Sequence, residues 1–285
     1  MEERRGLTFG QAEGREPLPT QLALRTIDAQ LAAVLWAVVH ESLIACIGSP
    51  GSAYGGNEII VDPWKNILRS WWVVSQHENI DEFPDARSIF KIVKHVITFR
   101  DYVVTFNFIQ FVIQNENCPA RLRTDVAKVL DHGRSAYRVI EDLIVPISSD
   151  EQASAIRAAM AVAAAAEAKG PRAHLRNASQ ELTGGKWAES IRESISAVEA
   201  AAKSIKPGAT TLGAALNELQ LTEKLNPALA RGFSALYGFT SSEHGIRHSL
   251  VDAGAAAVDE RDAIFMFGAC ATFVGYLLSS GPRSA

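Results

Sequence analysis

The chain has 285 residues, of which 47% are hydrophobic, 8% aromatic and 21% charged, so disorder is excluded for most of its length. Its 28 basic and 32 acidic residues give a net charge of −4, which excludes a surface-wide field that attracts polyanions and confines any nucleic-acid site to a local basic spot. The three cysteines, Cys46, Cys118 and Cys270, lie far apart without metal-binding spacing, so we expect a cytoplasmic protein with no metal or other cofactor.

A flexible arm is predicted over residues 1–20, and a helical N-terminal domain over residues 21–135. The arm has five glycine or proline residues and lacks the apolar core of a secretory signal. We place Trp64, Trp71 and Trp72 in the core of the domain rather than on a base-stacking surface, because few basic residues lie among them. A first helix is expected from Leu24 to just before Gly48, and a second one, capped by Asp62 and with Pro63 in its first turn, is expected to run through Trp72. Residues 84–114 should form one long helix or two abutting ones, and residues 119–131 a shorter helix.

Residues 136–147 depart from the helical pattern. Two short runs of β-branched, aromatic and other apolar residues, 137–140 and 143–147, flank Glu141 and Asp142. This pattern predicts a small β-hairpin, which also marks the domain boundary. Residues 148–285 are expected to form a second helical domain, so the predicted fold class is all-α, that is, mainly α-helical.

The second domain contains the clearest helix of the sequence, over residues 186–205. Ile195 and Val198 belong to a narrow apolar stripe and are expected to be nearly inaccessible, while Glu199 and Lys203 should pair on the other face. Capping residues at 148–151 predict an alanine-rich helix before it. Breaks are expected at Gly170-Pro171, Gly184-Gly185, Pro207-Gly208, Pro227 and Gly238.

The apolar run at residues 263–278 raises the question of a membrane span. It is shorter than the roughly 20 residues that cross a bilayer. It also contains two glycines and follows four consecutive charged residues, 259–262. We therefore expect a buried helix at the centre of a bundle, and no membrane partner.

One cluster of residues has the composition of a metal-independent RNA-cleaving site. The sequence lacks the P-loop, dinucleotide, zinc-protease and serine-hydrolase motifs. If residues 241–250 are helical, His244, Arg247 and His248 share one face. One histidine would remove the 2′-hydroxyl proton, another would protonate the leaving oxygen, and the arginine would offset charge on the phosphate. A helix-capping or intersubunit ion-pair role for the same residues is the alternative.

Several sequence blocks lie in a characteristic order along the chain, and the clearest of them lie in the second domain. The stronger blocks are residues 136–147, 192–199, 211–216, 236–241, 245–250 and 262–278, and weaker ones are Leu24-Arg25 and Leu35-Trp36. In this order the blocks resemble a bacterial family related to the abortive-infection AbiJ proteins, with a C-terminal HEPN-like domain. The resemblance covers most of the chain.

The resemblance implies a compact helical bundle that often dimerises and, in many relatives, a metal-independent ribonuclease acting as a toxin or anti-phage effector. Arg247 matches the motif arginine and His248 the polar residue beside it. The motif's second histidine, four to six positions after the arginine, is missing here, so His244 or His174 would have to replace it. Arg247 and His174 are also the residues expected to bind RNA phosphate.

The leading expectation is therefore a HEPN-type, metal-independent ribonuclease-like effector, a homodimer with its site at the dimer-interface groove and with an operon-encoded protein partner. The alternative is a catalytically inactive module that binds RNA, a nucleotide or a protein partner through the same residues. A third reading is a structural scaffold in which Arg247 and His248 cap helix ends.

Overall fold

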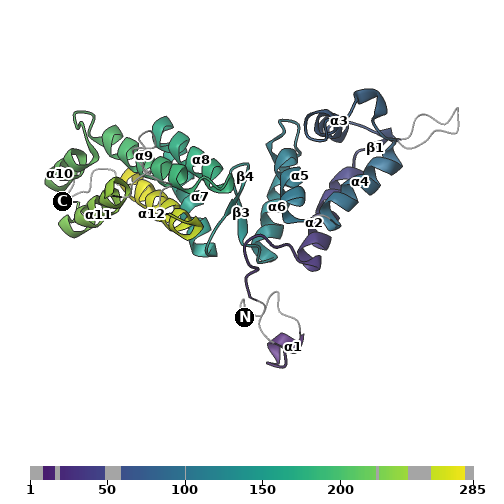
Figure 1. Ribbon diagram of the computed structural model, residues 1–285, viewed down its shortest axis with the longest axis horizontal. Coiled ribbons are helices and arrows are strands. Elements are labelled where there is room, and N and C mark those ends of the chain that lie inside the picture. Colours follow the sequence, from purple (N-terminus) through teal and green to yellow (C-terminus); the bar gives the residue numbers. More distant parts are fainter. Residues whose placement is uncertain are drawn as a thin grey trace. The chain divides into compact units, whose positions relative to one another are not determined.

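The computed structural model describes residues 9–16, 20–48, 59–99, 101–222, 225–242 and 258–279 (Figure 1). Helices dominate these residues, and within them strands occur only as two short two-stranded sheets, so the prediction of a mainly α-helical fold is confirmed. The chain divides into two compact units. The first comprises Met1–Phe108 and Pro119–Ala136, and the second comprises Ile109–Cys118 and Tyr137–Ala285.

The first unit is built around α2, which packs against α4 and α6. Its core contains Trp64 and Trp71, as predicted, whereas Trp72 is only half-buried and donates its Nε1 hydrogen to the Asn79 carbonyl. Trp64 donates to the Ser42 hydroxyl at 2.9 Å. The elements are α1 (Phe9–Ala12), α2 (Ala29–Ile44), β1 (Ile47–Gly48), β2 (Ile59–Ile60), α3 (Trp64–Val74), the 3-10 turn Ile80–Glu82, α4 (Ala86–Thr98), α5 (Tyr102–Gln114, shared with the second unit) and α6 (Ala120–His132).

Two predicted helix starts in this unit are wrong. Helix α2 begins at Ala29 rather than Leu24, because Arg25 has a left-handed φ of 64° that interrupts a helix, and Asp28 caps the new start through Leu31 N. Asp62 does not cap α3, since the cap position is Pro63 and no side chain accepts a hydrogen bond there. The predicted segment 84–114 is two helices, α4 and α5.

The second unit is a helical bundle with a β-hairpin. Helix α12 packs on α9, α7 and α8, and α8 packs on α9 and on β4. Figure 1 shows α12, in yellow, running alongside α9 and α7. The elements are β3 (Tyr137–Ile140), β4 (Leu143–Pro146), α7 (Asp150–Ala165), α8 (Lys169–Thr183), α9 (Trp187–Ile205), α10 (Leu212–Thr222), α11 (Pro227–Ser242) and α12 (Glu260–Ser279).

The predicted β-hairpin is confirmed, and it belongs to the second unit. β3 and β4 pair antiparallel, with Ile140 opposite Leu143, and all eight strand residues are buried. Glu141 adopts a φ of 55° at the turn. Buried Arg138 donates through Nε to Asp150 at 3.0 Å and through a terminal nitrogen to the Tyr137 carbonyl. These bonds attach the hairpin to the start of α7.

The α9 prediction is confirmed, but its buried surface is wider than a narrow stripe. Ile195 and Val198 are 4% and 1% exposed. Glu199 and Lys203 form the expected ion pair at 2.8 Å. Ser190, Ser194, Ala197 and Ala201 are buried as well, because α9 is contacted by α8, α10, α11 and α12 and so is covered from several sides.

Helix α12 is the one helix in the described part of the chain that is long and apolar enough to cross a membrane. Half of its twenty residues are buried against the bundle. Gly268 allows a close approach to α7, where Gln152 donates to the Ile264 carbonyl at 2.7 Å. Complete burial raises the pKa of Cys270 to about 12. These contacts favour the predicted bundle helix over a membrane span.

Two predicted breaks in the second unit are wrong. Gly170 and Pro171 lie in the first turn of α8 rather than ending the preceding helix, and a first turn tolerates proline. The preceding helix, α7, ends at Ala165, and Glu167 then has a left-handed φ of 50°. Gly238 lies inside α11.

Candidate functional site

Three of the four predicted site residues cannot be placed. His244, Arg247 and His248 lie outside the described residues, so their shared helical face remains a prediction. The fourth, His174, lies on α8 in the second unit. It provides the starting point for a candidate site.

His174 is hydrogen-bonded to a carboxylate on the neighbouring helix. Its Nδ1 lies 2.8 Å from Oε2 of Glu193 on α9. Asn177, one turn after His174 on α8, donates its side-chain amide to the same oxygen at 3.3 Å. The side chains of His174 and Glu193 are 37% and 26% exposed, so solvent and a ligand reach the site. The tight α8–α9 packing brings these residues together.

This arrangement suits proton transfer. When Nδ1 carries the hydrogen and donates to Glu193, the second ring nitrogen, Nε2, keeps its lone pair and accepts a proton. The carboxylate orients the ring and stabilises the imidazolium that forms, as in other carboxylate–histidine pairs. Asn177 donates a second hydrogen bond to the same carboxylate oxygen and so helps to fix its position. The three residues thus have the geometry of an oriented general base.

The arginines of α8 serve a different purpose. Arg172 donates to Glu141 at 2.8 Å through Nε, and Arg176 donates to Asp142 at 2.6 Å. Hydrogen bonding to Asp142 is the main cause of a raised Arg176 pKa. Because Arg172 and Arg176 lie about half a helical turn away from His174, they clamp the hairpin turn to α8 and do not complete the histidine site.

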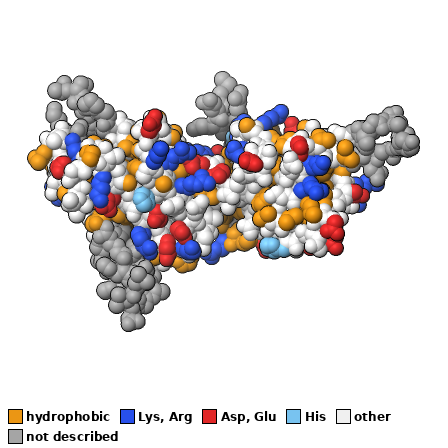
Figure 2. All heavy atoms as spheres, turned by 90° about the horizontal axis from the view of Figure 1, so that it is seen from above, with side chains coloured by type: hydrophobic (Ala, Val, Ile, Leu, Met, Phe, Trp, Pro, Cys, Tyr) orange, Lys and Arg blue, Asp and Glu red, His pale blue; other side chains and the backbone are white. Residues whose placement is uncertain are grey.

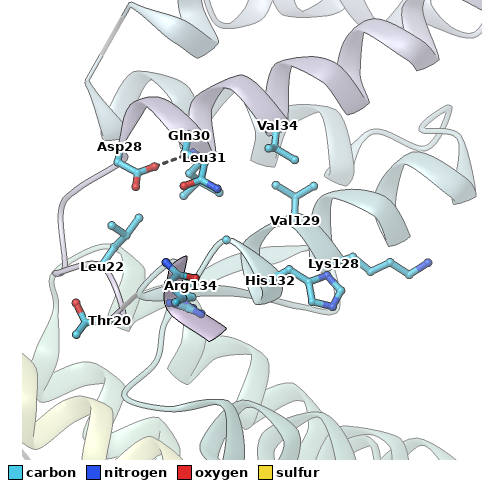
Figure 3. Close-up of a pocket in the computed structure, with 12 residues that line it drawn as sticks. Thr20, Leu22, Asp28, Gln30, Leu31, Val34, Lys128, Val129, His132 and Arg134 are labelled. Atoms are coloured by element: carbon cyan, nitrogen blue, oxygen red, sulfur yellow. Dashed lines mark hydrogen bonds between the residues drawn. The ribbon is translucent and has the colours of Figure 1, made fainter. Parts of the chain in front are cut away.

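A second candidate site is a cavity of about 380 Å³ in the first unit (Figure 3). Its walls come mainly from two segments about 100 residues apart in sequence, residues 20–34 and 128–134, together with Gln11 of α1. In Figure 3, Val34 and Val129 point toward one another across the cavity, and the ammonium of Lys128 extends away from it. The lining residues are Gln11, Thr20, Leu22, Asp28, Gln30, Leu31, Val34, Lys128, Val129, His132, Gly133 and Arg134.

Hydrogen bonds join the two segments that line this cavity. Leu22 N donates to the Arg134 carbonyl at 2.8 Å, and the Gln21 side chain donates to the Ser135 carbonyl. The cavity combines an apolar wall with His132, Arg134 and the capping carboxylate of Asp28. The apolar wall suits a small molecule with an apolar ring, and Arg134 suits an anionic group that lies away from the Asp28 carboxylate.

In the described part of the chain, no three His, Cys, Asp or Glu residues come together as a metal-binding group. The expectation of a protein without a metal is not tested by this finding.

The chain matches no family model, no curated protein and no solved structure. The AbiJ-like and HEPN-like resemblance therefore continues to rest on the sequence blocks alone.

Proposed function

We propose that this protein is a HEPN-type, metal-independent ribonuclease-like effector of bacterial anti-phage defence. The observation that carries the proposal is the half-exposed His174, oriented by Glu193 on a helical bundle. The AbiJ-like sequence blocks supply the choice of RNA as substrate. The protein acts in the cytoplasm as a homodimer, together with a protein encoded in its operon.

The proposed chemistry needs one base, one acid and one cation. His174 Nε2 removes the proton of a ribose 2′-hydroxyl, whose oxygen attacks the adjacent phosphorus. Arg247 offsets the charge that develops on the phosphate oxygens. His248 or His244 protonates the 5′ oxygen as its bond to phosphorus breaks. The products are a 2′,3′-cyclic phosphate and a free 5′-hydroxyl.

The proposal is tested by expressing Arg247→Ala and His248→Ala variants in bacteria. We expect the wild-type chain to be toxic and to cleave RNA in the presence of EDTA, and both variants to lose both properties at unchanged circular dichroism. Arg261→Ala is the matched control, because Arg261 is an exposed arginine of the same unit at the start of α12. Toxicity that both variants retain, or cleavage that requires a divalent metal, contradicts the proposal.

A second function, a non-catalytic nucleotide-binding module, is favoured by the cavity of the first unit. Its apolar wall of Leu22, Leu31 and Val129 suits a nucleobase, and Arg134 suits a phosphate. The chain would then bind nucleotide or RNA without cutting it.

For this second function, we expect a mononucleotide to bind the full chain in calorimetry more tightly than the corresponding nucleoside. Arg134→Ala should weaken nucleotide binding by roughly 10- to 100-fold, because it removes a charge-assisted hydrogen bond. The exposed Lys186→Ala variant, in the second unit, should bind like the wild type. Equal affinity for nucleotide and nucleoside contradicts this function.

A further inference from the structure

Helix α4 of the first unit has a solvent face rich in basic side chains, with Ser88 also exposed beside them. Arg87, Lys91, Lys94 and His95 are all exposed, and they fall within about one quarter of the helix circumference. The helix contains no acidic residue. We call these four residues the basic face of α4.

The cations of this face make no ion pair with any described residue. Other cations are paired: Arg121 with Glu41, Lys186 with Glu181 and Lys203 with Glu199. The acidic residues at the two ends of α4 cap helices. The pKa of Asp85 is lowered mainly by its hydrogen bonds with Ser88 and to a lesser degree by the charges of Arg87 and Lys91, but Asp85 forms no ion pair with either. Asp85 accepts from Ser88 N at 2.7 Å, and Asp101 accepts from Val104 N at 3.0 Å.

The basic face is held in a fixed orientation by the core. Ile89, Val93, Val96 and Ile97, on the opposite side of α4, are buried, and the helix packs on α2. The charged side chains are therefore displayed by a rigid element, and a ligand does not have to order the helix before it binds.

An aromatic platform adjoins the basic face. Phe99, directly after α4, is 71% exposed, and its ring stacks on His95 with centroids 5.5 Å apart and an interplanar angle of 22°. Exposed aromatic rings beside unpaired cations provide both requirements of single-stranded nucleic-acid binding, which are phosphate neutralisation and base stacking.

We infer that the basic face of α4, together with Phe99, is a docking surface for single-stranded RNA. Arg87, Lys91 and Lys94 contact consecutive phosphates, and a base stacks on Phe99. The choice of RNA rests on the proposed function. On the face drawn in Figure 2, blue and red side chains are interspersed, so attraction for a polyanion has to come from a local cluster of this kind.

The geometry favours RNA over an anionic membrane. A membrane-surface helix inserts its apolar side into the lipid. The apolar side of α4 is already buried in the unit, so the helix has no such side to insert.

The test measures the binding of a fluorescently labelled, mixed-sequence 20-nucleotide RNA to the full chain by anisotropy, in a His248→Ala background to avoid cleavage. We expect Arg87→Gln/Lys91→Gln/Lys94→Gln to weaken binding by on the order of 10- to 100-fold at about 100 mM salt. The slope of log affinity against log salt should become shallower by about 2. Phe99→Ala should weaken binding by about 5- to 100-fold.

The matched control is Arg121→Gln/Lys186→Gln/Lys203→Gln. It also removes one arginine and two lysine charges, but from positions where each charge forms an ion pair. It should bind RNA within about twofold of the parent. Equal losses in the two triple variants, or an unchanged salt slope, overturn the inference. So does binding to anionic phospholipid vesicles, but not to RNA, that depends on the basic face.

Failure of the docking surface and failure of the catalytic proposal give different results. If RNA binds through α4 but the wild-type protein does not cut it, the ribonuclease proposal fails and the docking surface stands. If the triple α4 variant binds RNA normally while the wild type is a toxic nuclease, the docking surface fails and the ribonuclease proposal stands.

Discussion

Truncation of Phe267 to alanine is expected to lower the free energy of unfolding by about 3–5 kcal/mol. Phe267 is completely buried in α12, which packs on α7, α8 and α9. The substitution removes its contacts and leaves a cavity that the surrounding helices fill only in part. Phe265, two residues earlier on the same helix, is 59% exposed, so Phe265→Ala should change stability by less than about 1 kcal/mol.

The comparison of these two variants also tests where α12 resides. Chemical denaturation of the purified chain, followed by circular dichroism, measures both stabilities. In a bundle helix the two phenylalanines differ strongly, because one side of α12 faces the core. In a membrane span both would face lipid or a partner helix, and the soluble fraction would lack the protein. Similar effects of the two substitutions would therefore contradict the bundle assignment.

Helices with regular apolar spacing and strong end signals were predictable from the sequence. Helix α9 and the hairpin β3–β4 lie where the pattern placed them, and Ser149 caps α7 as expected. The predicted helix boundaries are wrong where a residue type occurs both at helix ends and inside helices. Pro171 predicts a helix end, although proline also occurs in the first turn of a helix, as it does in α8. Gly238 lies within α11, because a single glycine lowers helix propensity without necessarily ending a helix.

The candidate site was predictable only in part. The sequence indicates His174, but its partner Glu193 lies 19 residues away on another helix, and no local spacing connects them. The cavity of the first unit was missed for the same reason. The basic face of α4 did have a sequence signal, because cations at 87, 91 and 94 follow helical spacing without an acid between them.

Local charge explains how an acidic protein would engage RNA. The net charge of −4 gives no long-range attraction, so binding depends on unpaired cations at defined positions. The arginines of α8 do not qualify, since Glu141 and Asp142 neutralise them. The cations of α4 do qualify, so the two proposals place RNA docking and RNA cleavage on different elements of the chain.

The His174→Asn variant is expected to lower the RNA cleavage rate by about 10²- to 10⁴-fold, the range for the loss of a general base. Asparagine places a donor near the position of Nδ1 and so retains a hydrogen bond to Glu193, but it has no counterpart of the basic Nε2. The fold and RNA affinity should therefore change little while turnover falls. Addition of imidazole to the His174→Asn reaction should restore part of the rate, which a merely structural histidine would not allow.

Glu193 should act by positioning this base. Glu193→Gln keeps an acceptor for Nδ1 and should cost about tenfold in turnover, whereas Glu193→Ala should cost more, because the ring loses its orientation. The controls are His77→Asn, at an exposed left-handed position that asparagine tolerates, and Glu199→Gln on the same helix as Glu193. Full turnover in His174→Asn, or equal losses in Glu193→Gln and Glu199→Gln, would remove the pair from the mechanism and leave the base to be sought among the other histidines.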